Sequence, residues 1–291
     1  MTWTSTNTTT TDNKREQEIL TPDNAQASQT FAGFELLAPQ AMTKLGMCMI
    51  LYGAAGAGKT PLAASCADSE YGCPTVFLDA EGGTQSIAHY DPDKLKVVQI
   101  YKWEELIRWS QSTFKDPRAY PFQTTVFDNL SEYYMLAQKY ITQDREMPSQ
   151  PEYGKINQLI ISFVEDWRDF TRRTGRNVIF IAWDDRDKDE NSVVKSTLAF
   201  TPGVVKALPG KVDIIGHLSV HNNPPYYTRI LNFAPSPKNQ AKFRRSLLGN
   251  AQKIPYEIPF HLENMPMPDI LSVLKGGGEW PSQKYTLPQR K

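Results

Sequence analysis

The sequence predicts an α/β fold in which a mostly parallel β-sheet is flanked by helices. Short runs rich in β-branched and aromatic residues alternate with amphipathic stretches, and this alternation is typical of a parallel sheet wrapped by helices. A loop of small residues follows the first buried run, at residues 53–60. Two late runs, at residues 212–220 and 226–235, predict a C-terminal antiparallel hairpin that extends one edge of the sheet.

The individual elements follow from the same patterns. Apolar runs predict strands, and stretches with helical periodicity predict helices. Pro61 is compatible with the first helix because it lies in the first turn. We expect strands at residues 47–53, 75–83, 96–101, 124–129 and 177–183, and helices at 59–68, 103–114 and around 156–170.

The composition is that of a globular protein with less ordered ends. The 291 residues are 40% hydrophobic and carry no net charge, so any surface that binds nucleic acid must be a local patch. Residues 1–38 are rich in Thr, Asn and Gln and predict a flexible segment. We expect the folded core at 39–250 and a Pro/Gly-rich extension, wrapping or loosely ordered, at 251–291.

The chain predicts a cytoplasmic protein, in the host cytoplasm if a phage encodes it. Its three cysteines, Cys48, Cys66 and Cys73, form no CxxC pair, which suits a reducing compartment. The sequence has no run of 18 apolar residues and does not begin like a signal peptide, so we expect no membrane partner.

The loop at residues 53–60 completes the pattern GxxxxGK[ST] as GAAGAGKT. Consecutive backbone N–H groups of such a loop converge on phosphate oxygens, the lysine reaches the β- and γ-phosphates, and the hydroxyl binds Mg²⁺. The sequence therefore predicts a site for ATP and Mg²⁺. The expected nucleotide-binding residues are Gly53, Ala54, Ala55, Gly56, Ala57, Gly58, Lys59 and Thr60.

Two acidic residues at strand ends are candidates for the rest of this site. Asp128 ends the run TTVFD, where a second acid that orients Mg²⁺ or its water belongs; the alternative is an N-cap for the following helix. Asn129 follows it, which disfavours the ATPases that place a catalytic Glu there. Glu81 in VFLDAEGG is our candidate for the base that activates water, and the alternative is a surface carboxylate in a turn.

The segments VFLDAEGG and TTVFDN resemble the core of RecA-type recombinases, and residues 45–250 resemble the small RecA-like P-loop proteins of bacteriophages. The resemblance implies that Glu81 activates the attacking water. It also implies that Lys242 and Arg244, within NQAKFRRSLL, enter the ATP site of a neighbouring subunit. A DNA contact and a solvated basic surface are the alternatives for these two cations.

The resemblance further implies DNA-contacting loops after the fourth and fifth strands, within residues 140–155 and 184–211. In the second loop, Lys195, Lys206 and Lys211 are candidates for phosphate contact and Phe200 for base stacking. The fifth strand departs from the family pattern because Trp183 occupies the position of the usual polar sensor. Either Asp184 takes over that task or the coupling between ATP and DNA differs.

The sequence thus predicts a DNA-stimulated ATPase that pairs or anneals single-stranded DNA. Its expected partners are single-stranded DNA, further copies of the chain in a ring or filament, and a single-strand-binding protein. A helicase-like or helicase-loading motor is the first alternative. A protein that uses ATP as a switch for assembly or binding, with little turnover, is another, and a small-molecule kinase is the most distant one.

Overall fold

The computed structural model describes residues 29–32, 34–36, 46–143, 145, 147–188, 194–223, 226–245 and 250–286. Contacts divide the chain into two units, Met1–Ala41 and Met42–Lys291. In the first unit, β1 (Gln29–Phe31) and β2 (Phe34–Leu36) form a short antiparallel hairpin. Most of the predicted flexible segment, residues 1–38, lies outside the described residues.

The second unit is built on one large sheet, whose strand order is β12-β10-β9-β3-β7-β6-β4-β5. The strands from β9 to β5 in this order pair in parallel, and β10 runs antiparallel to both of its neighbours. This arrangement confirms the predicted α/β fold with a mostly parallel sheet and a C-terminal antiparallel hairpin. The strands are β3 (Cys48–Gly53), β4 (Thr75–Asp79), β5 (Leu95–Gln99), β6 (Thr124–Asp128), β7 (Asn177–Lys188), β9 (Ile214–Asn223), β10 (Tyr226–Asn232) and β12 (Glu257–Phe260).

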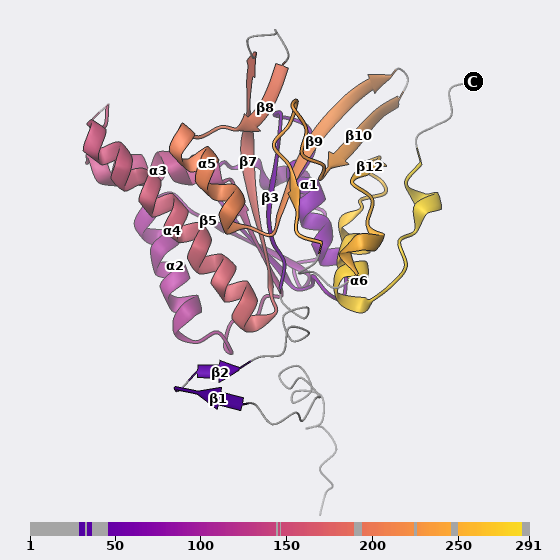
Figure 1. Cartoon of the computed structure of the whole chain (residues 1–291), viewed down its shortest axis with the longest axis horizontal. Helices are drawn as coiled ribbons and strands as arrows, with labels where there is room; N and C mark the ends of the chain where they lie inside the picture. The colour runs from indigo at the N-terminus through magenta and orange to yellow at the C-terminus, as the bar shows by residue number, and fades with distance from the viewer. Residues whose placement is uncertain are drawn as a thin grey trace, which may run out of the picture. The chain divides into compact units, whose positions relative to one another are not determined.

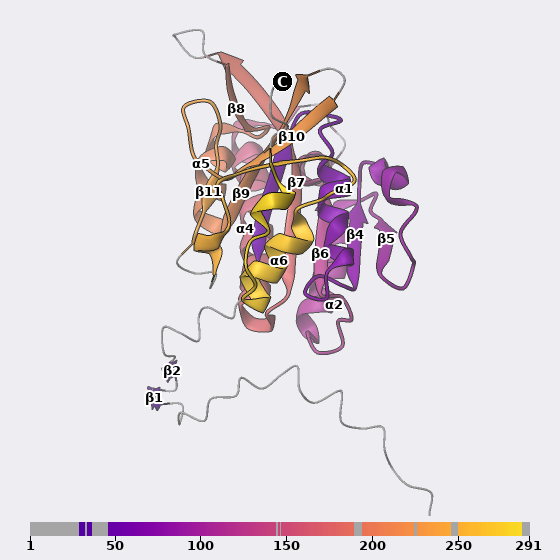
Figure 2. The same cartoon turned by 90° about the vertical axis from the view of Figure 1, so that its right-hand side faces the viewer.

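Helices cover both faces of the sheet (Figures 1 and 2). One face carries α2 (Trp103–Lys115), α3 (Leu130–Thr142), α4 (Gln150–Thr174) and α5 (Pro202–Lys211). The other carries α1 (Lys59–Ala64) and α6 (Met267–Gly276). Within the described ranges, no helix combines the length and the apolar character needed to cross a membrane.

The alternation of side chains along the strands creates two hydrophobic cores. In β3, Met49 and Leu51 pack toward α1 and α6, whereas Ile50 and Tyr52 pack toward α2–α5. All six residues of β3 are buried. Because both faces are covered, the strand has the continuous apolar sequence that is typical of parallel sheets.

The prediction that residues 184–211 form a second DNA loop is wrong, because most of this range is regular secondary structure. β7 continues to Lys188 and pairs with the antiparallel strand β8 (Val194–Leu198), after which α5 begins at Pro202. Phe200 packs on Tyr134, with ring centroids 5.8 Å apart, so it belongs to the core. Residues 184–188 were not predicted as part of β7 because this end of the strand projects beyond the core. Its sequence is charged and lacks the apolar alternation that indicates a strand.

The first DNA loop was predicted to lie within residues 140–155, and the connection between two helices falls inside this range. α3 continues to Thr142 and α4 begins at Gln150. The start of α4 is a capping box in which Ser149 and Glu152 satisfy one another's backbone N–H groups. Only the short connection between the two helices remains as a loop.

Residues 251–286 pack into the same core as the residues before them. A 3₁₀ turn (Ala251–Lys253) leads to β12, which pairs with β10 at the edge of the sheet. α6 then places Ile270 and Leu271, both fully buried, in the core beside α1. The Pro/Gly-rich composition of this segment concealed a regular strand and helix.

Candidate nucleotide-binding site

The P-loop lies between the end of β3 and the start of α1, and its glycines are required by its shape. A β-carbon on Gly53 would lie 2.2 Å from the carbonyl oxygen of Leu218. Gly58 has a φ of +97°, a conformation that favours glycine. The loop therefore takes the close, left-handed path that the sequence pattern predicts for a phosphate cradle.

Lys59 folds back over this loop. Its Nζ donates hydrogen bonds to the carbonyl oxygens of Gly53, at 2.8 Å, and Ala54, at 3.1 Å. Burial lowers the pKa of Lys59, and the nearby carboxylates of Glu81, Asp128 and Asp184 oppose that effect. The ammonium group is thus held within a cluster of acidic side chains at the mouth of the loop.

Thr60 and Asp128 come together, as the sequence predicts for a metal site. The Thr60 hydroxyl donates a 2.7 Å hydrogen bond to Asp128 Oδ2, while Asp128 Oδ1 is buried and has no partner among the described residues. Burial raises the pKa of Asp128 to about 7, and the Thr60 hydrogen bond opposes this rise. A hydroxyl and a carboxylate with a free oxygen fit Mg²⁺, a hard cation that prefers oxygen ligands.

Asp128 is not the N-cap of the following helix. That role belongs to Asn129, whose Oδ1 accepts a 2.8 Å hydrogen bond from the backbone N–H of Glu132. Asn129 also donates from Nδ2 to Glu81 Oε2. The residue after Asp128 therefore orients the candidate base, although it is not itself a carboxylate.

Glu81 lies in a turn that is built around a buried residue, Asp79. The Asp79 carboxylate is fully buried and accepts hydrogen bonds from the backbone N–H groups of Glu81 (3.0 Å) and Gly82 (2.8 Å). It also accepts from Thr84 Oγ1 (2.8 Å) and Gln99 Nε2 (3.0 Å). Sequence reasoning missed this residue, although an acid two positions before a Gly-rich turn was a visible signal.

The comparisons with known proteins agree with this geometry. The profile of a family described as an AAA domain matches residues 45–245, a range that contains the P-loop, Glu81 and Asp128. The chain belongs to this family. It is therefore a P-loop ATPase.

One solved structure that resembles this AAA domain protein is a KaiC-like protein from the hyperthermophilic archaeon Pyrococcus horikoshii OT3. The two are 14% identical, the match covers 75% of this chain and 86% of that chain, and the TM-score is 0.42. None of the curated proteins compared with the sequence matches it.

Lys242 and Arg244 lie away from the P-loop of their own AAA domain. β11 (Lys242–Phe243) pairs with the first residues of β9, whereas the P-loop follows the opposite end of the parallel strand β3. Lys242 Nζ donates to the carbonyl oxygens of Pro209 and Val212, the latter at 2.7 Å. Burial lowers the pKa of Lys242 to about 8.

Arg244 makes similar contacts at the carboxyl end of α5. Its Nη2 donates to the carbonyl oxygen of Gly210 at 3.1 Å, and its Nη1 lies 3.8 Å from the buried carboxylate of Asp213. Cations at a helix C-terminus interact favourably with its carbonyl groups. Both side chains thus have partners within the chain, and their role in a neighbouring ATP site stays a prediction.

The sensor position in β7 is occupied as the sequence indicates. Trp183 lies opposite Gly53 in the parallel register of β3 and β7. The next side chain, Asp184, is buried and accepts a 2.9 Å hydrogen bond from Arg186 Nε. Asp184 Oδ1 is buried without a partner in the described part of the chain. Asp184 is therefore close enough to influence Lys59, but the choice between the two predicted alternatives stays open.

Sequence reasoning missed Arg229, which contacts the P-loop from β10. Its Nε donates a 2.9 Å hydrogen bond to the carbonyl oxygen of Ala57. The Ala57 carbonyl oxygen lies outside α1, whose first helical bond runs from the N–H of Leu62 to the carbonyl oxygen of Gly58. Because Arg229 is 172 residues away from Ala57 in sequence, no local pattern could have revealed the contact.

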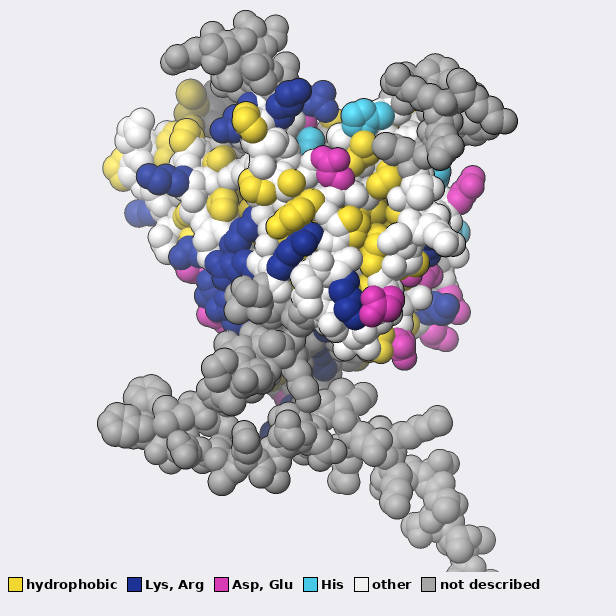
Figure 3. Space-filling model, turned by 45° about the vertical axis from the view of Figure 1, so that its right-hand side comes forward, with side chains coloured by type: hydrophobic (Ala, Val, Ile, Leu, Met, Phe, Trp, Pro, Cys, Tyr) yellow, Lys and Arg dark blue, Asp and Glu magenta, His cyan; other side chains and the backbone are white. Residues whose placement is uncertain are grey.

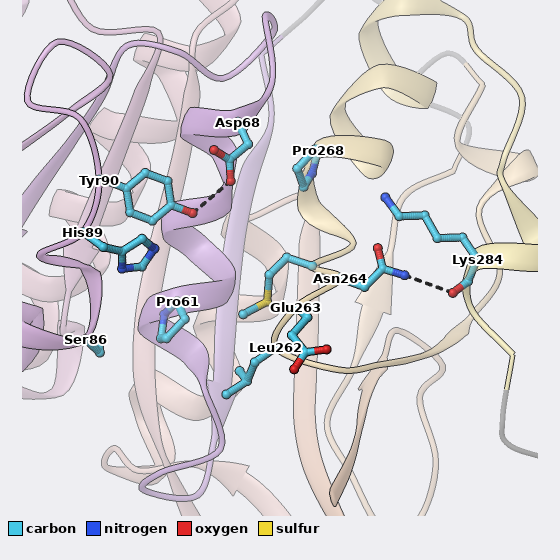
Figure 4. Close-up of a pocket in the computed structure, with 11 residues that line it drawn as sticks. Pro61, Asp68, Ser86, His89, Tyr90, Leu262, Glu263, Asn264, Pro268 and Lys284 are labelled. Carbon is cyan, nitrogen blue, oxygen red and sulfur yellow. Dashed lines mark hydrogen bonds between the residues drawn. The ribbon is translucent and has the colours of Figure 1, made fainter. Parts of the chain in front are cut away.

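A cavity of about 530 Å³ opens beside the first turn of α1 (Figure 4). Pro61 lies on its wall between two segments that are distant in sequence. On one side the hydroxyl of Tyr90 donates a 2.9 Å hydrogen bond to Asp68. On the other side lies Leu262, which is 46% exposed. The cavity was not predicted because half of its wall comes from the C-terminal extension.

Proposed function

We propose that this AAA domain protein is a DNA-stimulated ATPase that pairs or anneals single-stranded DNA in phage-type recombination. The observation that carries the ATPase part is the convergence of Lys59, Thr60, Asp128 and Glu81 at the carboxyl ends of three parallel strands. Ligands of open α/β sheets bind at this edge.

Each of these residues has a distinct role in the proposed reaction. The P-loop and Lys59 bind the triphosphate, and Thr60 and Asp128 hold Mg²⁺, which supplies positive charge to the phosphoryl oxygens. Glu81 accepts a proton from the water that attacks the γ-phosphate, giving ADP and inorganic phosphate. Asn129 holds the Glu81 carboxylate in place. Asn129 is therefore a positioning residue rather than the base.

We propose that the nucleoside lies in the cavity beside Pro61. The cavity volume of about 530 Å³ is in the range of small-molecule pockets. Pro61 is the residue after Thr60, so the cavity adjoins the phosphate cradle. Leu262 offers an apolar surface for a base, and Tyr90 and His89 line the opposite wall (Figure 4).

Two hairpins support the proposed action on DNA. β7–β8 and β9–β10 project from the same edge of the sheet as the P-loop (Figure 1), and β7 and β9 flank β3 directly. Tyr227, 59% exposed, is available for base stacking on β10. On the first hairpin, Arg186 and Lys195 are exposed and can contact phosphates.

The surface charge also supports this proposal. The chain has no net charge, yet Lys and Arg side chains gather in one area of the face shown in Figure 3. A local basic group of this kind contributes binding to a phosphate backbone without regard to sequence. Such binding suits strand annealing, in which any pair of complementary strands must be accepted.

We propose that the active form is a ring or filament of copies of this chain. Lys242 and Arg244 of one copy would then approach the triphosphate bound by the next and stabilise charge on its oxygens. This arrangement requires their contacts with the end of α5 to be released on assembly, because both cations are engaged there. A single-strand-binding protein is a further proposed partner.

The test is ATP hydrolysis at increasing protein concentration, with and without single-stranded DNA, beside an annealing assay with complementary oligonucleotides. We expect stimulation by DNA and a steeper than linear dependence on protein. Tyr227→Ala should reduce both DNA stimulation and annealing, whereas Tyr101→Ala, which changes a tyrosine that is 71% exposed beyond β5, should not. Turnover that ignores DNA would instead indicate an ATP-switched assembly protein, and duplex unwinding would indicate a helicase-like motor.

A further inference from the structure

Arg229 is a cation at the rim of the P-loop that forms no ion pair with the described residues. It is half-buried, and burial alone lowers the pKa of its guanidinium group. In the part of the chain that the structure describes, its one hydrogen bond goes from Nε to the Ala57 carbonyl oxygen. Holding a charge in a partly buried position costs free energy unless an opposite charge offsets it. The arrangement therefore suits an anionic ligand.

The contact with Ala57 fixes where this cation lies. Because Nε is bonded to the Ala57 carbonyl oxygen, the guanidinium group lies against Gly58. A β-carbon on Gly58 would lie 3.0 Å from Arg229 Nε and 3.3 Å from Leu262 Cδ2. Arg229 thus sits between the phosphate cradle and the cavity that Leu262 lines.

The two Nη groups of Arg229 make no hydrogen bond to a described residue. A guanidinium group has five N–H donors in a planar fork that matches phosphate oxygens, and a phosphate bound in the P-loop would be the nearest anion. Such a contact would also connect the bound phosphate to the hairpin β9–β10, because Arg229 belongs to β10 and pairs with Val220 of β9.

We propose that Arg229 is a phosphate-binding residue that the hairpin β9–β10 supplies to the nucleotide bound in the P-loop of the same chain. This inference rests on the proposed use of the P-loop for ATP. It adds a cation acting within the chain to the site, distinct from the predicted pair Lys242 and Arg244. It also gives the projecting hairpin a direct contact with the bound nucleotide.

The principal alternative is that Arg229 only anchors the loop through the Ala57 carbonyl oxygen. The two roles can be separated with Arg229→Lys, which keeps the positive charge that Arg229→Gln removes but lacks the planar guanidinium group. If Arg229 only anchors the loop, Arg229→Lys and Arg229→Gln should weaken ATP binding to the same extent. If its charge binds phosphate, Arg229→Lys should retain more affinity for ATP than Arg229→Gln.

The experiment measures dissociation constants for ATP, inorganic tripolyphosphate and adenosine by calorimetry, at one fixed salt concentration, with the full chain. We expect Arg229→Gln to weaken ATP and tripolyphosphate binding by about tenfold or more and to leave adenosine binding within about twofold. Arg229→Lys should lose less affinity for ATP than Arg229→Gln. Arg118→Gln, which removes an exposed arginine far from the P-loop in sequence, is the matched control and should change none of the three constants.

Three outcomes would overturn the proposal: unchanged ATP affinity in Arg229→Gln, equal weakening of adenosine and ATP, or an equal loss of ATP affinity in Arg229→Lys and Arg229→Gln. Thermal unfolding of each variant separates a folding defect from a binding defect. A wild-type protein that binds neither ATP nor tripolyphosphate would refute the proposed nucleotide site itself. That failure is distinct from a wild type that binds both and an Arg229→Gln variant that binds equally well.

Discussion

At the scale of single residues, buried carboxylates organise the candidate site. Both oxygens of Asp79 accept hydrogen bonds that shape the turn carrying Glu81. One oxygen of Asp128 accepts a hydrogen bond from Thr60, and the other has no partner among the described residues. One acid therefore fixes the geometry of the turn, and the other is available to a metal ion.

Replacing Asp79 tests its role as a positioning residue. Asp79→Asn puts an amide N–H₂ where hydrogen-bond donors point, so we expect a loss of about 2–3 kcal/mol in the free energy of unfolding. The turnover number should fall while the Michaelis constant for ATP changes little, because Glu81 is displaced but the P-loop is intact. Asp93→Asn, at an exposed aspartate, is the control. Unchanged turnover in a folded Asp79→Asn protein would contradict this role.

Replacing Thr60 tests the metal site. Thr60→Val keeps the shape of the side chain but removes the hydroxyl that contacts Asp128. We expect ATP affinity to fall by about tenfold in the presence of Mg²⁺, the scale of one hydrogen bond to a charged group. With Mg²⁺ removed by a chelator, wild type and variant should bind ATP alike. A loss of the same size under both conditions would show that Thr60 does not act through the metal.

At the scale of elements, α6 ties the C-terminal extension to the core. Lys275 in the last turn of α6 donates a 2.6 Å hydrogen bond to the carbonyl oxygen of Gly175, the C-cap of α4. Burial lowers the pKa of Lys275 from 10.5 to about 8. The contact thus joins two helices on opposite faces of the sheet, at a cost in free energy while the lysine is charged.

This contact predicts a specific dependence of stability on pH. Between pH 8 and 10.5 the unfolded chain keeps the Lys275 proton that the folded protein has lost, so stability rises with pH in that window. Relative to Lys275→Met, the wild type should gain at most about 3 kcal/mol in the free energy of unfolding. Urea denaturation at pH 7.5 and pH 10.5 measures the change. A difference between the two proteins that stays constant with pH would contradict the buried charge.

The sequence was informative where elements lie within the core and uninformative where they project from it or contain prolines. β3, β4, β6 and the first part of β7 are continuous apolar runs because helices cover both faces. β8 and the end of β7 carry charges because they extend past that cover. α5 and α6 were not predicted because both contain prolines, including Pro209 in the interior of α5.

At the scale of the whole molecule, the site is assembled from segments far apart in sequence. The P-loop, Glu81 and Asp128 were predictable because each follows a strand whose sequence has a clear pattern. Asn129 and Arg229 were not assigned because their roles depend on contacts that only the folded sheet creates. The cavity depends on a contact between α1 and the C-terminal extension, for which the sequence carries no local signal.

Assembly can be tested by mixing two inactive proteins. If copies share active sites, Lys59→Ala keeps a working Lys242 and Arg244, while Lys242→Ala/Arg244→Ala keeps a working P-loop. Random mixing in a ring or filament would then pair intact partners at about a quarter of the interfaces and restore that share of turnover. Because both cations also contact the end of α5, unfolding must be checked first. A mixture of folded variants without turnover would contradict sites shared between copies.

The central claim is that this carboxyl edge hydrolyses ATP, with Glu81 as the base. The most direct test compares ATP binding and steady-state hydrolysis in the wild type and Glu81→Gln, with Glu70→Gln, at an exposed glutamate, as the control. We predict that Glu81→Gln binds ATP and Mg²⁺ normally but turns over at least about 100-fold more slowly, while the control is unaffected. Normal turnover in Glu81→Gln would contradict the assignment of Glu81 as the base.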